Sequence, residues 1–120
     1  FISQAIREVG ITGCHDVSEG GIILALAELS IKNNIGIKIE IPEKIRNAKW
    51  LFGEDPSRYI ITTKNKEKLV KLATQKNITI QKVGKSEGDL FKISNEFEIS
   101  VKKLVTYNKL WFKNYLNGEK

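Results

Sequence analysis

The spacing of apolar and polar positions predicts an alternation of helices and strands from the first residue onward. Residues 1–9 place their apolar side chains at i, i+3, i+4 and i+7, the pattern of an amphipathic helix. Gly10 follows where a glycine ends many helices. Residues 11–14 fit the end of a strand, and residues 22–31 are apolar at nearly every position. A helix that is apolar almost all round is typically buried.

The middle of the chain predicts three more strands and an outer helix. Strict alternation at residues 37–41 indicates a half-buried strand that Pro42 ends, and a similar alternation predicts a strand at residues 78–83. The β-branched residues of 59–63 predict a buried strand. Between these strands, residues 66–76 have apolar residues on one face and lysines on the other, as in a helix on the outside of the protein.

The last third predicts a polar turn, a hairpin and a helix. Residues 84–89 form the turn, and the two apolar runs at 90–93 and 97–99 are spaced like the strands of a hairpin. Ser100 is placed to cap a helix that begins at Val101.

Two apolar clusters are less regular. Ile45 and Ala48 are positioned to line a short helix, and we expect Trp50 and Phe52 in the core. A C-terminal cluster is too apolar to stay unpacked and must lie against the domain's own core or an absent neighbour; it comprises Leu110, Trp111, Phe112, Tyr115 and Leu116.

Strands and helices without a strict βαβ alternation predict the α+β class, with a mixed or antiparallel sheet covered by helices. A chain of 120 residues is long enough for one domain with its own core, so we expect residues 1–120 to form a single domain. The sequence contains no methionine, not even at position 1, so we expect it to be a fragment of a longer chain.

Composition indicates a cytoplasmic protein without a membrane segment. The chain is 41% hydrophobic and 28% charged, and it lacks the run of about 20 apolar residues that a membrane helix requires. The N-terminus does not have the basic and then apolar character of a signal peptide. A single cysteine, Cys14, excludes an internal disulfide and fits a reducing compartment.

The net charge of +6 is concentrated in the second half of the chain. Residues 1–60 carry 7 basic and 8 acidic groups, whereas residues 61–120 carry 13 basic groups, all of them lysines, and 6 acidic groups. A basic half suits a nucleic-acid-binding module. However, the lysines are scattered singly without arginines or an aromatic platform, so solvated surface is the favoured interpretation.

The stretch HDVSEGG, residues 15–21, is the first candidate site. The start of a helix offers free backbone N–H groups and a positive dipole end, which suit an anion. Asp16 and Ser18 could contact a ligand or cap the helix that follows. Gly20 and Gly21 permit a close approach of the backbone, either to an anion or to the sheet.

Two reactive residues precede this turn. His15 is the only histidine and could act as a base, but neighbours in a strand point to opposite faces, so we expect no cooperation with Asp16. Cys14 lies in an apolar strand, where a thiol is expected to be buried and inert. The chain has one histidine and one cysteine, adjacent to each other, and we therefore expect no metal site.

The second candidate site is GEDPSR, residues 53–58. Pro56 disfavours a helical Asp55, which predicts a loop. Glu54 and Arg58 could contact substrate or phosphate, or could pair with each other and hold the loop. The phosphate-binding motifs GxxxxGK[ST] and GxGxxG are absent from the sequence.

Taken together, these motifs resemble a known family. HDVSEGG before an apolar helix, LFGEDPSR at 51–58, the strand RYIIT and the later KVGKSEGDLFKI at 82–93 are similar to the C-terminal domain of the synthetase subunit of phosphoribosylformylglycinamidine synthases. Aminoimidazole ribonucleotide synthetase, selenophosphate synthetase and thiamine-monophosphate kinase share the fold. HDVSEGG fits several of these enzymes, and LFGED-x-SR narrows the resemblance to the first.

The resemblance implies a fold like the aminoimidazole ribonucleotide synthetase C-terminal domain, which is partly ferredoxin-like. It also implies an ATP-dependent C–N ligase of purine biosynthesis. Such an enzyme phosphorylates the amide oxygen of formylglycinamide ribonucleotide, and ammonia from a glutaminase then displaces that oxygen as phosphate. ATP and Mg²⁺ would be bound mainly by the rest of the chain, so the isolated domain would be inactive.

In this interpretation the chain supplies no catalytic residue and lines one wall of a cleft, either catalytic or structural. The residues expected to bind substrate or nucleotide are Asp16, Ser18, Gly20, Gly21, Glu54 and Arg58. The implied partners are the remainder of the chain, a glutaminase domain or subunit, and a small-molecule substrate. Another member of the superfamily and a lysine-rich nucleic-acid-binding module are the alternatives.

Overall fold

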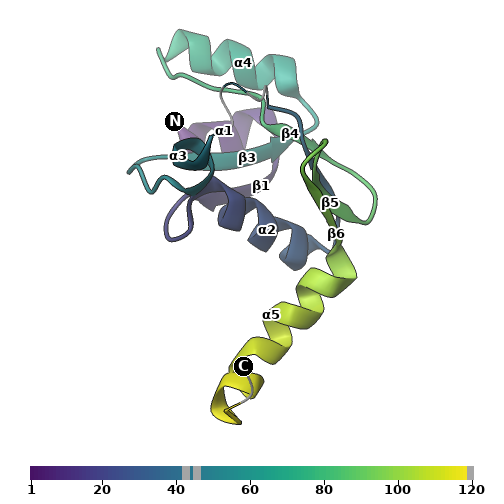
Figure 1. Ribbon diagram of the computed structural model, residues 1–120. Helices are drawn as coiled ribbons and strands as arrows, with labels where there is room; N and C mark the ends of the chain where they lie inside the picture. Colours follow the sequence, from purple (N-terminus) through teal and green to yellow (C-terminus); the bar gives the residue numbers. More distant parts are fainter. Residues whose placement is uncertain (42–43, 45–46, 119–120) are drawn as a thin grey trace. The chain divides into compact units, whose positions relative to one another are not determined.

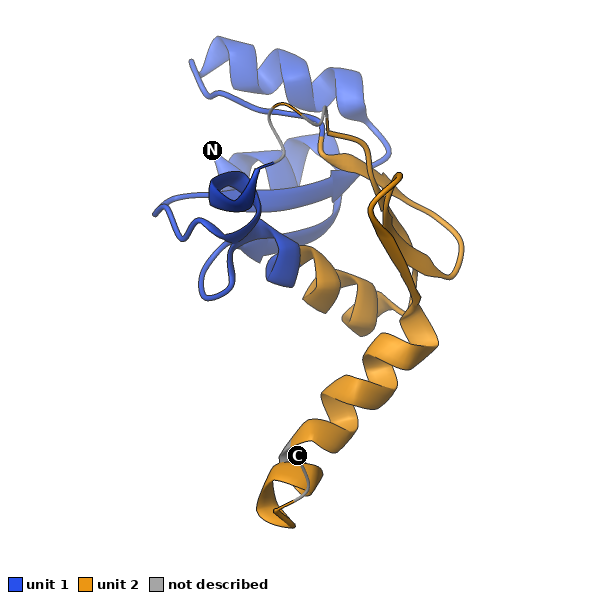
Figure 2. Ribbon diagram, viewed as in Figure 1, with its two compact units in different colours: residues 1–25, 47–82 blue, residues 26–46, 83–120 orange. Residues whose placement is uncertain are grey.

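The computed structural model describes residues 1–41, 44 and 47–118. These residues divide into two compact units, one formed by residues 1–25 and 47–82 and the other by residues 26–46 and 83–120 (Figure 2). Helix α2, Gly21–Asn33, begins in the first unit and ends in the second. That residues 1–120 act as a single domain therefore stays a prediction.

The first unit contains a two-stranded antiparallel sheet. Strand β1, Ile11–Asp16, pairs with β3, Tyr59–Thr63 (Figure 1). The register sets Asp16 opposite Tyr59 and Cys14 opposite Ile61. β1 is longer than the predicted strand, because its ladder continues through His15 and Asp16. Both polar segments identified in the sequence are therefore attached directly to this sheet.

Helices α1, Ile2–Val9, and α4, Lys66–Gln75, share a small apolar core in this unit. Ala5, Val9 and Leu72 are buried there, which agrees with the helical periodicity of both segments. As predicted, Gly10 ends α1 in the left-handed conformation, at φ 81°. The Asn65 side chain then donates to the Val9 carbonyl at 2.8 Å and joins the end of α1 to the start of α4.

The second unit contains a four-stranded mixed sheet in the order β4-β2-β5-β6. Its central strands β2 and β5 are parallel, and the two outer pairs are antiparallel. The bounds are Ile37–Ile39 for β2, Gly84–Ser86 for β4, Leu90–Ile93 for β5 and Phe97–Ser100 for β6. The predicted hairpin at 90–99 is confirmed, and so is the α+β class with a mixed sheet.

Alternate residues of the central strands form the core of the second unit. Ile37, Ile39, Phe91 and Ile93 are buried, and Ile41 continues the pattern just beyond β2. Pro42, predicted to end that strand, lies outside the described residues. This is the burial that the period-two alternation of residues 37–41 predicts.

The chain ends in α5, Val101–Leu116, which Ser100 caps as predicted, its hydroxyl accepting from the Lys103 N–H at 3.2 Å. The prediction that the C-terminal apolar cluster packs on the chain's own core is wrong. In α5, the exposed side chains include Leu110, Trp111, Tyr115 and Leu116. Packing on an absent neighbour stays a prediction. No helix in the described part of the chain is long and apolar enough to cross a membrane.

The strand predicted at residues 78–83 is wrong. This segment joins the sheet only at its end, where the Glu40 N–H donates to the Val83 carbonyl at 2.8 Å. The antiparallel partner of β2 is β4, which lies in the segment predicted to be a polar turn. A Cβ on Gly84 would lie 2.0 Å from the Lys38 carbonyl oxygen, so a glycine permits this pairing. Ile78 and Ile80 alternate in the sequence but are exposed.

A short helix, α3, spans Ala48–Phe52. Of the two residues expected to line a short helix, Ala48 begins α3 and Ile45 lies outside the described residues. The Asn47 side chain caps α3 by accepting from the Trp50 N–H at 2.9 Å. The prediction that Phe52 lies in the core is wrong, because this side chain is 58% exposed at the end of a five-residue helix. Trp50, also expected in the core, is half-buried.

Truncation of Ile39 tests this account of the core. Ile39 is fully buried in β2, so we expect Ile39→Ala to lower the free energy of unfolding by about 3 kcal/mol. Ile78→Ala removes the same atoms from a side chain that is 42% exposed and should cost well under half as much. Urea denaturation of both variants measures the difference. Equal losses in the free energy of unfolding would show that Ile78 is buried, as the strand predicted at 78–83 requires.

Candidate functional site

The two polar segments begin at the same end of the β1–β3 ladder, within the first unit. Asp16 is the last residue of β1, and Tyr59, the first residue of β3, is its partner across the ladder. The Val17 N–H then donates to the Arg58 carbonyl at 2.9 Å and continues the pairing by one step. The turn 17–21 and the loop 53–58 therefore start side by side.

The two glycines of the turn are required by contacts inside the protein. Gly20 and Gly21 have φ values of 75° and 68°, in the left-handed region that favours glycine. A Cβ on Gly21 would lie 2.6 Å from the Leu51 carbonyl oxygen and 2.6 Å from the Phe52 Cα. The backbone that lies close to Gly21 is therefore that of α3. The sequence alone left two alternatives for this close approach, an anion and the sheet.

A hydrogen bond joins the loop to the turn. Glu54 lies two residues after the end of α3, and its Oε1 accepts from the Gly20 N–H at 3.0 Å. The Gly21 N–H donates to the Ser18 carbonyl at 3.1 Å and closes the turn. The loop and the turn are thus one connected structure.

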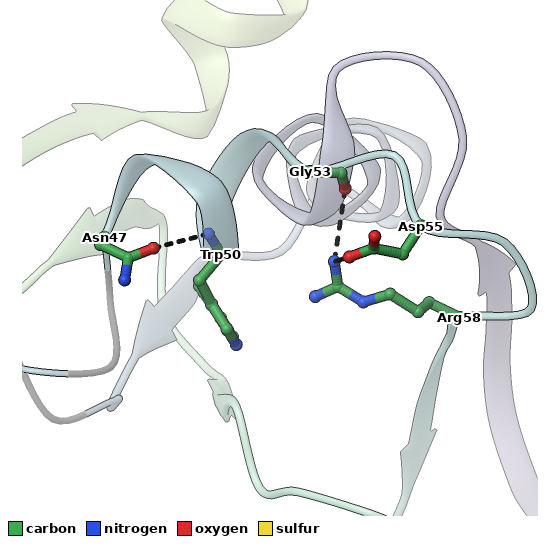
Figure 3. A network of polar contacts seen from close by, with 5 residues as sticks. All are labelled: Asn47, Trp50, Gly53, Asp55 and Arg58. Carbon is green, nitrogen blue, oxygen red and sulfur yellow. Dashed lines mark hydrogen bonds and ion pairs between the residues drawn. The ribbon is translucent and has the colours of Figure 1, made fainter.

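Arg58 is held inside the loop. Its Nη1 donates to the Gly53 carbonyl at 3.3 Å and lies 3.6 Å from Asp55 Oδ2 (Figure 3). Asp55 therefore takes the place of Glu54 in the ion pair that the sequence suggested. Because one nitrogen makes both contacts, the guanidinium has further N–H groups that could face a ligand.

His15 and Asp16 lie closer together than their strand positions suggested. The His15 Nδ1 is 2.5 Å from the Asp16 carbonyl oxygen and 3.7 Å from Asp16 Oδ1. The expectation that neighbouring strand residues keep their side chains apart is wrong here, because the imidazole bends along the backbone of the next residue. The Asp16 side chain itself remains exposed.

Cys14 is exposed, and its predicted burial is therefore wrong. It shares a face of β1 with Asp16, two residues further on. Partial desolvation raises the pKa of the Cys14 thiol, and the negative charge of Asp16 raises it further. A raised pKa favours the protonated thiol, so a nucleophilic role gains no support.

Ser18 is exposed, and whether its side chain or that of Asp16 meets a ligand stays a prediction. Tyr59 is a residue that the sequence interpretation missed, since the β-branched run around it suggested a buried strand. Only the register with β1 reveals that it stands beside Asp16. Among the residues that the structure describes, no three His, Cys, Asp or Glu side chains gather closely enough to hold a metal ion.

Comparison with known proteins places these features in a wider context. The family model described as the AIR synthase related protein, C-terminal domain, matches residues 1–92. Two curated relatives, the phosphoribosylformylglycinamidine synthase subunits PurL of Brucella ovis and of Brucella suis, are each 38% identical over 121 aligned residues. The alignments cover 99% of this chain but 16% of each relative's length.

Solved structures give the same fold. PurL of Thermotoga maritima, in structures described as complexed with ATP and with FGAR, matches 85% of this chain and 20% and 19% of the respective longer chains. The TM-score is 0.67 in both cases, at 21% sequence identity. At this level of identity the likeness concerns the fold alone.

The contact of Gly21 with α3 predicts different costs for two glycine substitutions. Gly21→Ala and Gly88→Ala both place an alanine in the left-handed region, which costs about 1 kcal/mol or somewhat more. Only at Gly21 would the added methyl group meet backbone atoms, since a Cβ on Gly88 has no neighbour within 4 Å. Urea denaturation should therefore show a loss at Gly21 at least twice as large. Equal losses would mean that α3 does not approach the turn.

Asp16→Asn should make Cys14 react faster. The substitution removes the negative charge that raises the pKa of the thiol, so the pKa falls and the thiolate fraction at pH 7.5 increases. Alkylation by iodoacetamide, followed by mass spectrometry, measures the rate, with Asp55→Asn as the matched control. A rate unchanged by Asp16→Asn, or raised equally by both substitutions, would contradict the placement of Asp16 beside Cys14.

Proposed function

Because the chain belongs to the family of C-terminal domains of AIR synthase related proteins, we propose that it is the C-terminal domain of a phosphoribosylformylglycinamidine synthase. That enzyme is the ATP-dependent ligase that converts formylglycinamide ribonucleotide to the amidine with glutamine-derived ammonia. The observation that carries this proposal is the 38% identity to PurL subunits over 99% of the chain. The relatives and solved structures described above favour this enzyme over another member of the superfamily and over a nucleic-acid-binding module.

The chain would act as one part of a larger enzyme. It spans 16% of the length of the curated relatives, so the remainder of the ligase would supply most of the nucleotide site and the catalytic residues. A glutaminase domain or subunit would deliver ammonia. The proposed location of the enzyme is the cytoplasm. In this proposal the isolated chain has no ligase activity.

The proposed role of the chain is to form one wall of the binding cleft. That wall is the end of the β1–β3 ladder with its two polar segments, and its residues are Asp16, Ser18, Gly20, Gly21, Glu54 and Arg58. The Asp16 carboxylate is exposed and suits a ligand hydroxyl, and the remaining N–H groups of Arg58 suit a phosphate oxygen.

In this proposal the residues have different tasks, which their contacts support. The Gly20 N–H is bonded to Glu54, and the Gly21 N–H is bonded to Ser18, so these two amides hold the wall together. Asp16, Ser18 and Arg58 are then the residues that reach toward a ligand. A wall held in one geometry before the ligand arrives binds it with less loss of conformational entropy.

ATP and Mg²⁺ enter the proposal through the rest of the enzyme. ATP would supply the phosphoryl group that activates the amide oxygen. The described residues lack a cluster of three potential metal ligands, so the proposal places Mg²⁺ in the rest of the enzyme. No step of the reaction is assigned to a side chain of this chain, whose part is to position the substrate or nucleotide.

An amide NMR titration tests the proposed wall. We expect Mg-ADP or formylglycinamide ribonucleotide to produce saturable shifts that cluster at residues 16–21 and 54–58. The turn at residues 94–96 lies in the other compact unit and serves as an internal control. The titration is carried out on the 120-residue chain and on the same segment, isotopically labelled, within the full-length enzyme.

The two samples give distinct outcomes. Shifts in both would indicate that the wall binds before the rest of the enzyme closes the cleft. Shifts in the full-length enzyme alone would indicate that the wall needs the remaining domains. The absence of shifts at both segments in the full-length enzyme, with shifts elsewhere, would refute the proposed location of the wall.

A further inference from the structure

Tyr59 is an exposed aromatic side chain at the edge of the proposed wall. It is 54% exposed, although it opens a strand whose next residue, Ile60, is buried. Tyrosine is enriched at binding interfaces, because it combines an apolar ring with a polar hydroxyl group. The position of Tyr59, rather than its exposure alone, indicates what would bind there.

The register places Tyr59 directly opposite Asp16. Side chains of directly opposite residues in an antiparallel pair lie on the same face, with their Cβ atoms about 5 Å apart. Cys14 and Ile61 form the next pair on that face, and both Cys14 and Asp16 are exposed. An aromatic ring and a carboxylate therefore stand together on an accessible surface.

This pair also lies where the two polar segments begin. Asp16 precedes the turn 17–21, and Tyr59 follows the loop 53–58, with the Val17–Arg58 hydrogen bond directly beyond them. A ligand bound at this end of the ladder would lie next to this pair. Nucleotides have the matching chemistry, because an aromatic base can stack on a ring and a ribose hydroxyl can donate to a carboxylate.

We propose that Tyr59 stacks on the base of a purine nucleotide while Asp16 accepts a hydrogen bond from its ribose. This inference rests on the proposed function, because it assigns the base-recognition part of the same wall. It adds a residue to that wall and commits the ligand to one with an aromatic base. Formylglycinamide ribonucleotide has no such base, so the inference favours an adenine nucleotide at this position.

The structure also supplies a local probe of binding. Cys14 is the single cysteine of the chain, and it is exposed on the face that Tyr59 and Asp16 share. A nucleotide bound there should protect Cys14 from alkylation. Peptide mass spectrometry of the full-length enzyme measures the alkylation of the peptide that contains Cys14. Nucleotide bound elsewhere does not contribute to this signal.

The experiment compares the full-length enzyme with variants at Tyr59 and at a matched position. Tyr59→Val removes the ring and keeps strand propensity, Tyr59→Phe keeps the ring, and Tyr107→Ala removes a tyrosine that is 57% exposed on α5. The Mg-ADP concentration that half-protects Cys14 should rise about tenfold in Tyr59→Val. It should stay unchanged in Tyr59→Phe and Tyr107→Ala, and protection by Mg-pyrophosphate, which has no base, should be the same in every variant.

Each other result has one meaning. Equal half-protection by Mg-ADP in the wild type and in Tyr59→Val would overturn the inference and leave the proposed function standing. The same result with a lower melting temperature for Tyr59→Val would show that Tyr59 packs against the rest of the enzyme. No protection of Cys14 in the wild-type enzyme, together with amide shifts at residues 16–21 and 54–58, would place the ligand on another face and also overturn it. If those shifts are absent too, the proposed wall itself fails.

Discussion

The close approach of the α3 backbone to Gly21 is the constraint on which the candidate site depends. A side chain at position 21 would occupy the space that the Leu51 carbonyl and the Phe52 backbone fill. Because α3 lies against the turn, Glu54, two residues after its end, can reach the Gly20 N–H. The left-handed conformation of both glycines is therefore part of the packing between two segments that are more than thirty residues apart in the sequence.

The sequence predicted the elements whose burial has a clear period. α1, α4 and β2 follow from spacings of 3.6 or 2 residues, and the structure confirms them. The strand at residues 78–83 failed because alternation identifies residues that suit a sheet without identifying a partner strand. The pairing with β2 starts at Val83, and β4 depends on Gly84 and its lack of a side chain, a condition set by tertiary contact.

The candidate site was predictable as two segments but not as a set of contacts. Turn-forming residues and polar side chains mark residues 15–21 and 53–58 in the sequence, and both segments lie at one end of the β1–β3 ladder. That Arg58 pairs with Asp55, that Glu54 bonds to Gly20 and that Tyr59 faces Asp16 all depend on register and helix placement. Propensity cannot supply such information, because it describes each residue with its neighbours in the chain.

The contacts at this end of the ladder are consistent with the recognition role proposed for the chain. A catalytic group needs a proton acceptor or nucleophile tuned to its reaction, whereas here the Cys14 thiol has a raised pKa and the His15 imidazole is turned to the backbone of Asp16. The residues with internal partners, Gly20 and Glu54, fix the geometry of the wall. The exposed groups, Asp16 and Tyr59, carry complementary chemistry on the surface that it presents. In the proposed function, such a surface would orient a ligand for groups located in the rest of the enzyme. The chain covers 16% of its relatives' length, and a positioning role is consistent with that share.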